Sequence, residues 1–175
     1  MGRQGLLLGR LRLAAGTWPG RRGWTKTALL AAAYGLTALP LGLAGGLLTP
    51  GCTAAPGPAL AFALASFIAP SLGEEMLFRV LPIPHASEAV EPRRRRAWAA
   101  TALILFVLWH PLNAWLLKPW LGPLFYDPLF LLLAGLLGLA CTVAYLRTGS
   151  LWPPVLIHWL AVLVWNLCLG GPALP

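Results

Sequence analysis

The chain has 175 residues, of which 58% are hydrophobic and 10% are charged, whereas an average soluble domain is roughly 25% charged. This composition excludes an ordinary soluble protein and indicates a polytopic membrane protein. The formal net charge is +8, from 13 Lys and Arg against 5 Asp and Glu. In a membrane protein, such an excess indicates topology and contact with anionic lipid headgroups rather than binding of nucleic acid.

Residues 1–26 form a basic segment around a short leucine-rich stretch. A secretory signal peptide would have a longer apolar core and a small-residue cleavage site. We therefore expect a short amphipathic, lipid-facing, cytoplasmic segment, followed by a single transmembrane helical domain over residues 27–171. The basic residues of the segment are Arg3, Arg10, Arg12, Arg21, Arg22 and Lys26.

Five apolar segments approach the length of about 20 residues that a membrane-spanning helix needs. The predicted fold class is therefore all-α: a polytopic membrane helix bundle with about five transmembrane helices plus the N-terminal amphipathic segment. Pro40 and Pro111 should bend the first and third spans, and Pro70 in the second fits a polar pocket, where freed carbonyls find other partners. The predicted spans are residues 27–48, 59–81, 97–117, 129–146 and 151–169.

The distribution of Lys and Arg favours one orientation. The arginines at positions 93–96, in a predicted solvated loop, and Arg147 fall on the same side as the N-terminus, whereas the two loops on the other side carry only Lys118. The positive-inside rule then places the N-terminus and the basic loops in the cytoplasm of a plasma or other inner membrane. Trp98, Trp120 and Trp152 lie near predicted helix ends, which is typical of interfacial anchoring.

Three ionisable residues interrupt the second span, and two histidines lie in later spans. Glu74, Glu75 and Arg79 follow Pro70, whereas His110 lies in the third predicted span and His158 in the last. An ionised side chain at the centre of a membrane helix costs about 2.5–3.5 kcal/mol by insertion measurements, so such groups indicate a functional site. Each of them also has a structural interpretation, as a helix-stabilising ion pair or as an interhelical hydrogen bond.

The spacing of these residues suggests separate roles for the two glutamates. Glu75 and Arg79 are four residues apart on a helix and should form an ion pair. Glu74 is rotated by about 100° and is free to meet the histidines, with which it could hold and deprotonate a water molecule. The depths agree only if the third helix begins before the membrane surface, because His110 would otherwise lie about 20 Å deep and His158 about 10 Å.

The three cysteines, Cys52, Cys141 and Cys168, are widely spaced and lack the spacing of a metal or redox motif. We interpret them as small apolar packing residues.

The pattern resembles the CPBP family, which contains the type II CAAX prenyl endopeptidases and the bacteriocin-processing Abi proteins. The resemblance covers residues 59–169 and rests on E-E-x-x-x-R at residues 74–79, on F-x-x-x-H at residues 106–110, and on His158 in a last apolar helix. It implies an intramembrane glutamic endopeptidase without a cofactor or metal. In that case Glu74 and His110 would activate water, Glu75 and Arg79 would support the site, and His158 would help to stabilise the oxyanion.

One position departs from the family pattern. The family commonly has Asn four residues after the third-motif histidine, to complete the oxyanion hole, and this chain has Val162 there. Asn113 and Asn166 are the candidate replacements, although Asn166 lies about 12 Å further along the helix than His158. Loss of one oxyanion donor typically costs 10²–10³ in rate. Activity is therefore reduced, supported by Asn113, or absent.

Three hypotheses follow. The first is a membrane-embedded endopeptidase that acts on a peptide or protein substrate near the cytoplasmic face. The second is a catalytically inactive membrane scaffold or partner-binding protein, which Val162 favours. The third is a metal-dependent variant in which Glu74, His110 and His158 are the ligands, although H-E-x-x-H spacing is absent. A transporter would show duplicated halves or paired broken helices, and the sequence shows neither.

Overall fold

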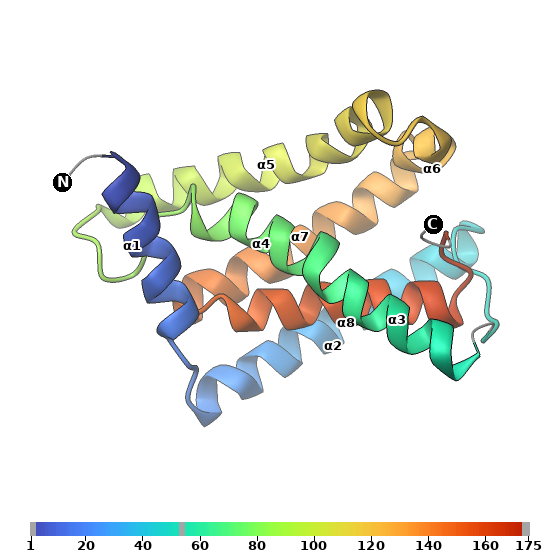
Figure 1. Ribbon diagram of the computed structural model, residues 1–175, viewed down its shortest axis with the longest axis horizontal. Helices are drawn as coiled ribbons and strands as arrows, with labels where there is room; N and C mark the ends of the chain where they lie inside the picture. Colours follow the sequence, from blue (N-terminus) through green and yellow to red (C-terminus); the bar gives the residue numbers. More distant parts are fainter. Residues whose placement is uncertain (1–2, 53–54, 173–175) are drawn as a thin grey trace.

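The computed structural model describes residues 3–52 and 55–172, which form a helical bundle without a β-strand in this part of the chain (Figure 1). An N-terminal helix α1 precedes the long helix α2, and an irregular span of α3, η1, α4 and η2 follows. Helix α5, the short helices η3 and α6, and the long helices α7 and α8 complete the chain. Their bounds are α1 Arg3–Gly16, α2 Arg21–Ala44, α3 Pro56–Ser66, η1 Phe67–Leu72, α4 Gly73–Glu75, η2 Met76–Val80, α5 Pro92–Leu116, η3 Pro119–Leu121, α6 Gly122–Phe125, α7 Pro128–Thr148 and α8 Trp152–Cys168.

Each of the five predicted spans corresponds to a helical segment, which confirms the all-α membrane bundle. Four segments of the described chain are long and apolar enough to cross a bilayer: Arg21–Ala44, Pro56–Val80, Pro92–Leu116 and Pro128–Thr148. The fifth, α8, has 17 residues. It is about 25 Å long, somewhat less than the roughly 30 Å of a bilayer core.

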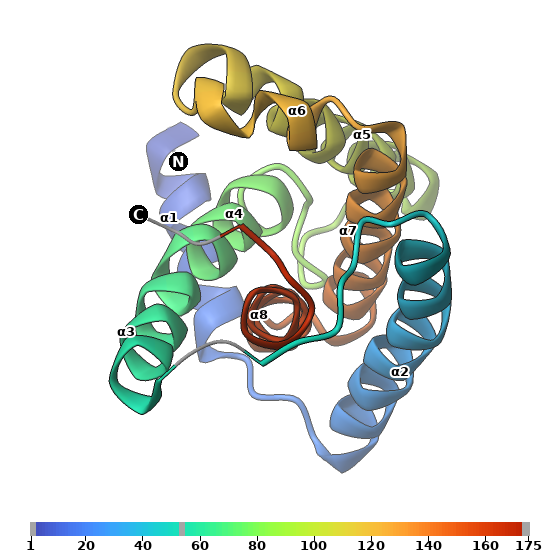
Figure 2. The ribbon, with the colours of Figure 1, turned by 90° about the vertical axis from the view of Figure 1, so that its right-hand side faces the viewer.

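Helix α7 occupies the centre of the packing and contacts α2, α5 and α8. It carries small residues where the neighbours approach, as is typical of helix interfaces in membranes. A methyl group on Gly138 would lie 2.7 Å from Leu103 Cδ1 and 2.8 Å from Phe106 Cδ1, so only glycine allows α5 this close. Figure 2 shows α8 end-on, enclosed by α2, α7 and the span that contains α3 and α4. Helices α5 and α8, which carry His110 and His158, are thereby held against α7.

The span Pro56–Val80 is interrupted at Ala69, whose φ of −137° and ψ of 119° are extended rather than helical. Pro70 follows it, and the ring of a proline disfavours the helical conformation of the preceding residue. The interruption lies one turn before Glu74, in agreement with the polar pocket expected at Pro70. Pro40 and Pro111 lie inside α2 and α5, and both helices continue through them.

Two local predictions were wrong. The arginines at positions 93–96 were expected in a solvated loop, but α5 begins at Pro92 and includes them in its first turns. Proline is well suited to the first helical position, because its missing N–H would be unpaired there anyway. The helix thus begins five residues earlier than the predicted start at residue 97. Residues 121–128, expected as a loop, include the last residue of η3 and the whole of α6.

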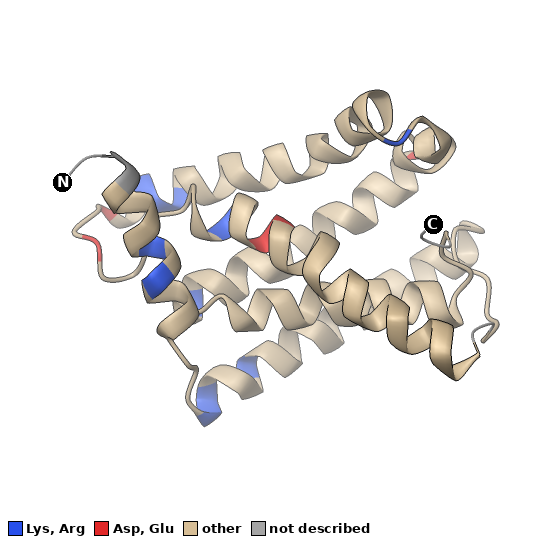
Figure 3. Cartoon of the chain, viewed as in Figure 1, with Lys and Arg blue, Asp and Glu red and all other residues tan. Residues whose placement is uncertain are grey.

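Most of the basic residues gather at the end of the bundle where α1 lies, whereas Lys118 lies at the opposite end (Figure 3). Helix α1 docks there through a bidentate contact, in which Arg10 Nε and Nη2 each donate to a Glu88 carboxylate oxygen at 2.7 Å. Ala14 is buried against the bundle, and Leu6, Leu7, Leu8 and Leu13 are exposed, so α1 has one packed face and one apolar outer face. Helix α2 begins at Arg21, so the boundary predicted at residue 26 falls within this helix.

Candidate active site

A buried ion pair forms the base of the site. Glu75 and Arg79 both have fully buried side chains, and Arg79 Nη1 donates to Glu75 Oε1 at 3.1 Å, as their spacing predicted. Arg79 Nη2 donates to the backbone carbonyl of Gly138 at 3.1 Å, and its guanidinium carbon lies 4.1 Å from the centroid of the Phe106 ring. The guanidinium therefore links the span Pro56–Val80 to both α5 and α7.

His158 of α8 lies between the two glutamates. Its Nδ1 is 2.8 Å from Glu75 Oε1, and its Nε2 is 4.0 Å from Glu74 Oε2. An ionised carboxylate only accepts hydrogen bonds, so the proton on Nδ1 is donated to Glu75 and Nε2 is directed towards Glu74. Glu75 thus fixes the orientation of the imidazole as well as pairing with Arg79.

Glu74 differs from Glu75 in its surroundings. Its side chain is 17% exposed, and Oε2 has no hydrogen-bond partner in the described part of the protein. The carboxylate lies at the wall of a cavity rather than in the packed core. Adjacent glutamates on one helix therefore have different environments, because a rotation of about 100° separates them.

His110 is held from the opposite wall. Its Nδ1 donates to the carbonyl of Phe106, one turn earlier in α5, at 3.0 Å. This contact fixes the tautomer, so the neutral ring has an unprotonated Nε2. The ring is packed edge-on against Phe106, Phe125 and Phe130, with centroid separations of 5.1, 5.4 and 5.2 Å.

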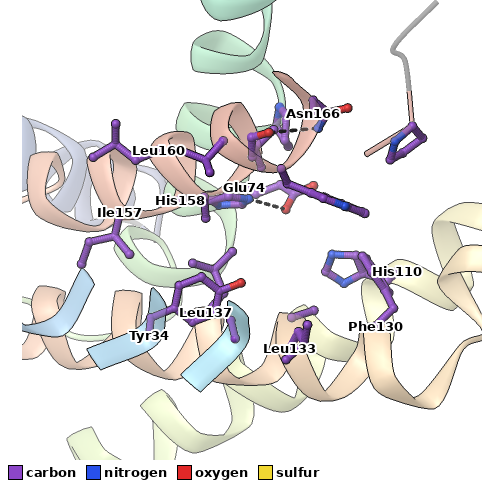
Figure 4. Close-up of a pocket in the computed structure, with 18 of the residues that line it drawn as sticks. Tyr34, Glu74, His110, Phe130, Leu133, Leu137, Ile157, His158, Leu160 and Asn166 are labelled. Atoms are coloured by element: carbon purple, nitrogen blue, oxygen red, sulfur yellow. Dashed lines mark hydrogen bonds and ion pairs between the residues drawn. The ribbon is translucent and has the colours of Figure 1, made fainter. Parts of the chain in front are cut away.

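One cavity of about 620 Å³ is lined by Glu74, His110 and His158. Figure 4 shows His110 on the side facing Glu74 and His158, with an open centre between them. Most of the other lining residues are apolar and come from α2, α7 and α8, for example Tyr34, Leu137 and Ile157. A few polar groups thus converge in an otherwise apolar chamber, as is typical of ligand and active sites.

The two candidate oxyanion residues also line this cavity. Asn166 Nδ2 donates to the carbonyl of Val162 in its own helix at 3.0 Å, which uses one of its two N–H groups. Asn113 Oδ1 is buried without a hydrogen-bond partner in the described part of the chain. Val162 lines the cavity as well.

Of two further contributors to the site, Gly138 was not identified from the sequence and Phe106 was named only as a motif position. The Gly138 carbonyl accepts a hydrogen bond from Arg79, and the Phe106 ring packs against the Arg79 guanidinium. A glycine within an apolar helix carries little signal of this role, and Phe106 appeared only as part of a motif. Within residues 3–52 and 55–172, no group of three His, Cys, Asp or Glu side chains is arranged so that it could hold a metal ion.

The fold and the site define an integral membrane protein with a buried Glu–Arg–His cluster beside a chamber. The profile of the family described as "Type II CAAX prenyl endopeptidase Rce1-like" matches residues 56–164, more than half of the chain. The chain therefore belongs to this family of CAAX-protease-type membrane endopeptidases. No curated protein and no solved structure gives a significant match.

Proposed function

We propose that the protein is an intramembrane glutamic-type endopeptidase, in which Glu74 and His110 activate the water that attacks a peptide carbonyl. The observation that carries the proposal is that Glu74, His110 and His158, from three separate spans, line one cavity. Charged and polar groups inside a membrane span are costly, and their convergence on a shared chamber supports a chemical role.

The hydrogen bonds around His110 support its role as a proton acceptor. Because Nδ1 donates to the Phe106 carbonyl, Nε2 has a free lone pair for a water proton. The carboxylate of Glu74, whose side chain is 17% exposed, is the other acceptor at the cavity wall. A water bound by both groups would lose a proton as its oxygen bonds to the peptide carbonyl carbon.

His158 is suited to the negative charge that then develops on the carbonyl oxygen. Its Nδ1 is bonded to Glu75, so a donor role requires a second proton on Nε2. The positive charge of this imidazolium would be balanced by two carboxylates. Glu75 Oε1 lies 2.8 Å from Nδ1, and Glu74 Oε2 lies 4.0 Å from Nε2. Transfer of a proton to the amide nitrogen completes the reaction as the C–N bond breaks, which leaves a new carboxylate and a new amine.

The proposal includes an orientation and a class of substrate. The basic end of the bundle faces the cytoplasm, with the N-terminus and the start of α5 on that side, because Lys and Arg concentrate there (Figure 3). The partners are membrane lipids and a peptide or protein substrate. The family name points to prenylated C-terminal CAAX peptides, and the predominantly apolar chamber is compatible with a lipidated chain.

The test uses protein reconstituted in lipid vesicles and a fluorogenic farnesylated CAAX peptide, with unprenylated peptides in parallel. Glu74→Gln and His110→Ala should each lower turnover by 10²–10⁴-fold, the typical contribution of general acid–base catalysis. Glu91→Gln is the matched control, because this exposed glutamate lies before α5 and away from the cavity. Unchanged cleavage by both site variants would disprove the assignment.

A second candidate is an inactive scaffold of the same fold. Val162 favours it, because it stands where the family pattern has an oxyanion donor. This candidate predicts that Glu74→Gln preserves both the expression and the cellular phenotype of the protein. The enzyme predicts normal expression with loss of the phenotype, so the two outcomes separate the candidates.

A further inference from the structure

Residues 47–52, which we call the strap, lie between α2 and α3 and run beside the end of α8. Gly51 pairs with Leu169 in an isolated parallel bridge. The amide of Thr49 donates to the Leu169 carbonyl at 3.1 Å, and the amide of Gly51 donates to the Cys168 carbonyl at 3.0 Å. Gly170 has a φ of +69°, and a methyl group there would overlap Thr49, so the backbone geometry also favours this close approach.

This pairing brings together two thiols that are far apart in the sequence. Cys52 Sγ and Cys168 Sγ are 3.2 Å apart, although 116 positions separate them in the chain. Cys52 is exposed, Cys168 is partly exposed, and Cys141 is buried in α7. The interpretation of all three as packing residues therefore holds for Cys141 and is wrong for Cys52.

We propose that Cys52 and Cys168 form a disulfide bond that fastens the strap to the end of α8. The oxidant is the disulfide of a thiol–disulfide oxidoreductase. The exposed Cys52 thiolate attacks one sulfur of that disulfide and releases a thiol, and Cys168 then attacks the mixed disulfide and releases the second thiol. The two protein thiols lose two electrons and two protons in total, and the oxidant is reduced to a dithiol.

The position of the pair determines both its chemical environment and its effect. The pair lies where α2 and α8 end, and both helices begin at the basic end of the bundle (Figure 1). In the proposed orientation this is the non-cytoplasmic side, where disulfides persist. Leu47 and Leu48 of the strap line the cavity together with Leu169, so the bond would fix one wall of the chamber.

The experiment counts reactive thiols in membranes that contain the full-length chain. Acid first stops thiol–disulfide exchange, so that the thiols keep the state they have in the membrane. The proteins are then denatured and treated with a polyethylene-glycol maleimide, with or without prior reduction. The wild type should gain one polymer without reduction, on Cys141, and three after reduction. Cys52→Ser and Cys168→Ser should each gain two without reduction, because each variant frees the partner thiol.

Cys141→Ser is the matched control and should gain none without reduction and two after it. Three additions to the unreduced wild type would overturn the proposal, as would a disulfide-linked dimer in place of the internally bridged monomer. The wild-type count requires no variant, so a folding defect in a serine variant cannot hide the result. The count is also independent of peptidase activity, so its failure is distinguishable from failure of the proposed catalytic function.

Discussion

Replacement of Arg79 by methionine should destabilise the protein more than any surface substitution. Methionine retains much of the length of the side chain but removes the donors to Glu75 and to the Gly138 carbonyl, and the charge above Phe106. The substitution would take away the guanidinium partner of the Glu75 carboxylate. This loss is costly because Glu75 is fully buried. Breaking a buried pair from one side costs about 3–5 kcal/mol, and we expect this range for Arg79→Met.

The assay is unfolding in mixed detergent micelles, followed by fluorescence of the 9 tryptophans. Arg147→Met removes an exposed arginine and should change the free energy of unfolding by less than about 0.5 kcal/mol. In the double variant Glu75→Gln/Arg79→Met, neither member of the pair remains as an unpaired charge. The double variant should therefore lose less free energy of unfolding than the sum of the two single variants, by about 0.5–3 kcal/mol. A loss below about 1 kcal/mol for Arg79→Met would refute the reasoning, because the pair would then add little to a buried site.

Three further results are expected. Val162→Asn supplies an amide donor at the cavity wall and should raise peptide turnover in vesicles by about tenfold or more, and a lower rate would contradict this. Gly138→Ala places a methyl group against Phe106 and should lower the free energy of unfolding by about 1–3 kcal/mol in the same micelle assay. Partial burial raises the pKa of Glu88, but hydrogen bonds from the Arg10 guanidinium and a backbone amide outweigh it and hold the pKa below its ordinary 4.5. The contribution of this pair is therefore complete above about pH 4.5 and is lost as pH falls through the lowered pKa. Hydrogen-exchange protection of the α1 amides, measured at each pH and corrected for the intrinsic exchange rate, should fall over that range in the wild type and should not change over it in Arg10→Met.

The sequence predicted the helical segments and the family because both leave local signals. Apolar runs of about 20 residues mark the spans, and the E-E-x-x-x-R motif places Glu75 and Arg79 on one helix face by periodicity alone. The profile match over residues 56–164 confirms the resemblance found from these motifs. The start of α5 was missed because arginine is typical of solvated loops in membrane proteins, yet it is also a good helix former after a proline.

The relations between distant residues could not be read from the sequence. Nothing in the spacing of His158 indicates that it bonds Glu75 rather than Glu74, because the rotation of α8 is set by its packing against α7 and η1. The approach of Cys52 to Cys168 depends on a backbone bridge between Gly51 and Leu169. The contact of Arg79 with the Gly138 carbonyl likewise depends on how η2 lies beside α7. The close approach of α5 to Gly138 is only weakly indicated by a glycine in an apolar helix.

The most direct measurement of the proposed water activation is chemical rescue of Glu74→Ala in vesicles. Removal of this side chain should leave space at the wall of the cavity and lower peptide turnover by at least about 10²-fold. Added formate should restore part of the turnover in proportion to its concentration, because it supplies the missing carboxylate, and it should have no such effect on the wild type or on Glu91→Ala. Wild-type turnover by Glu74→Ala without formate would contradict the account.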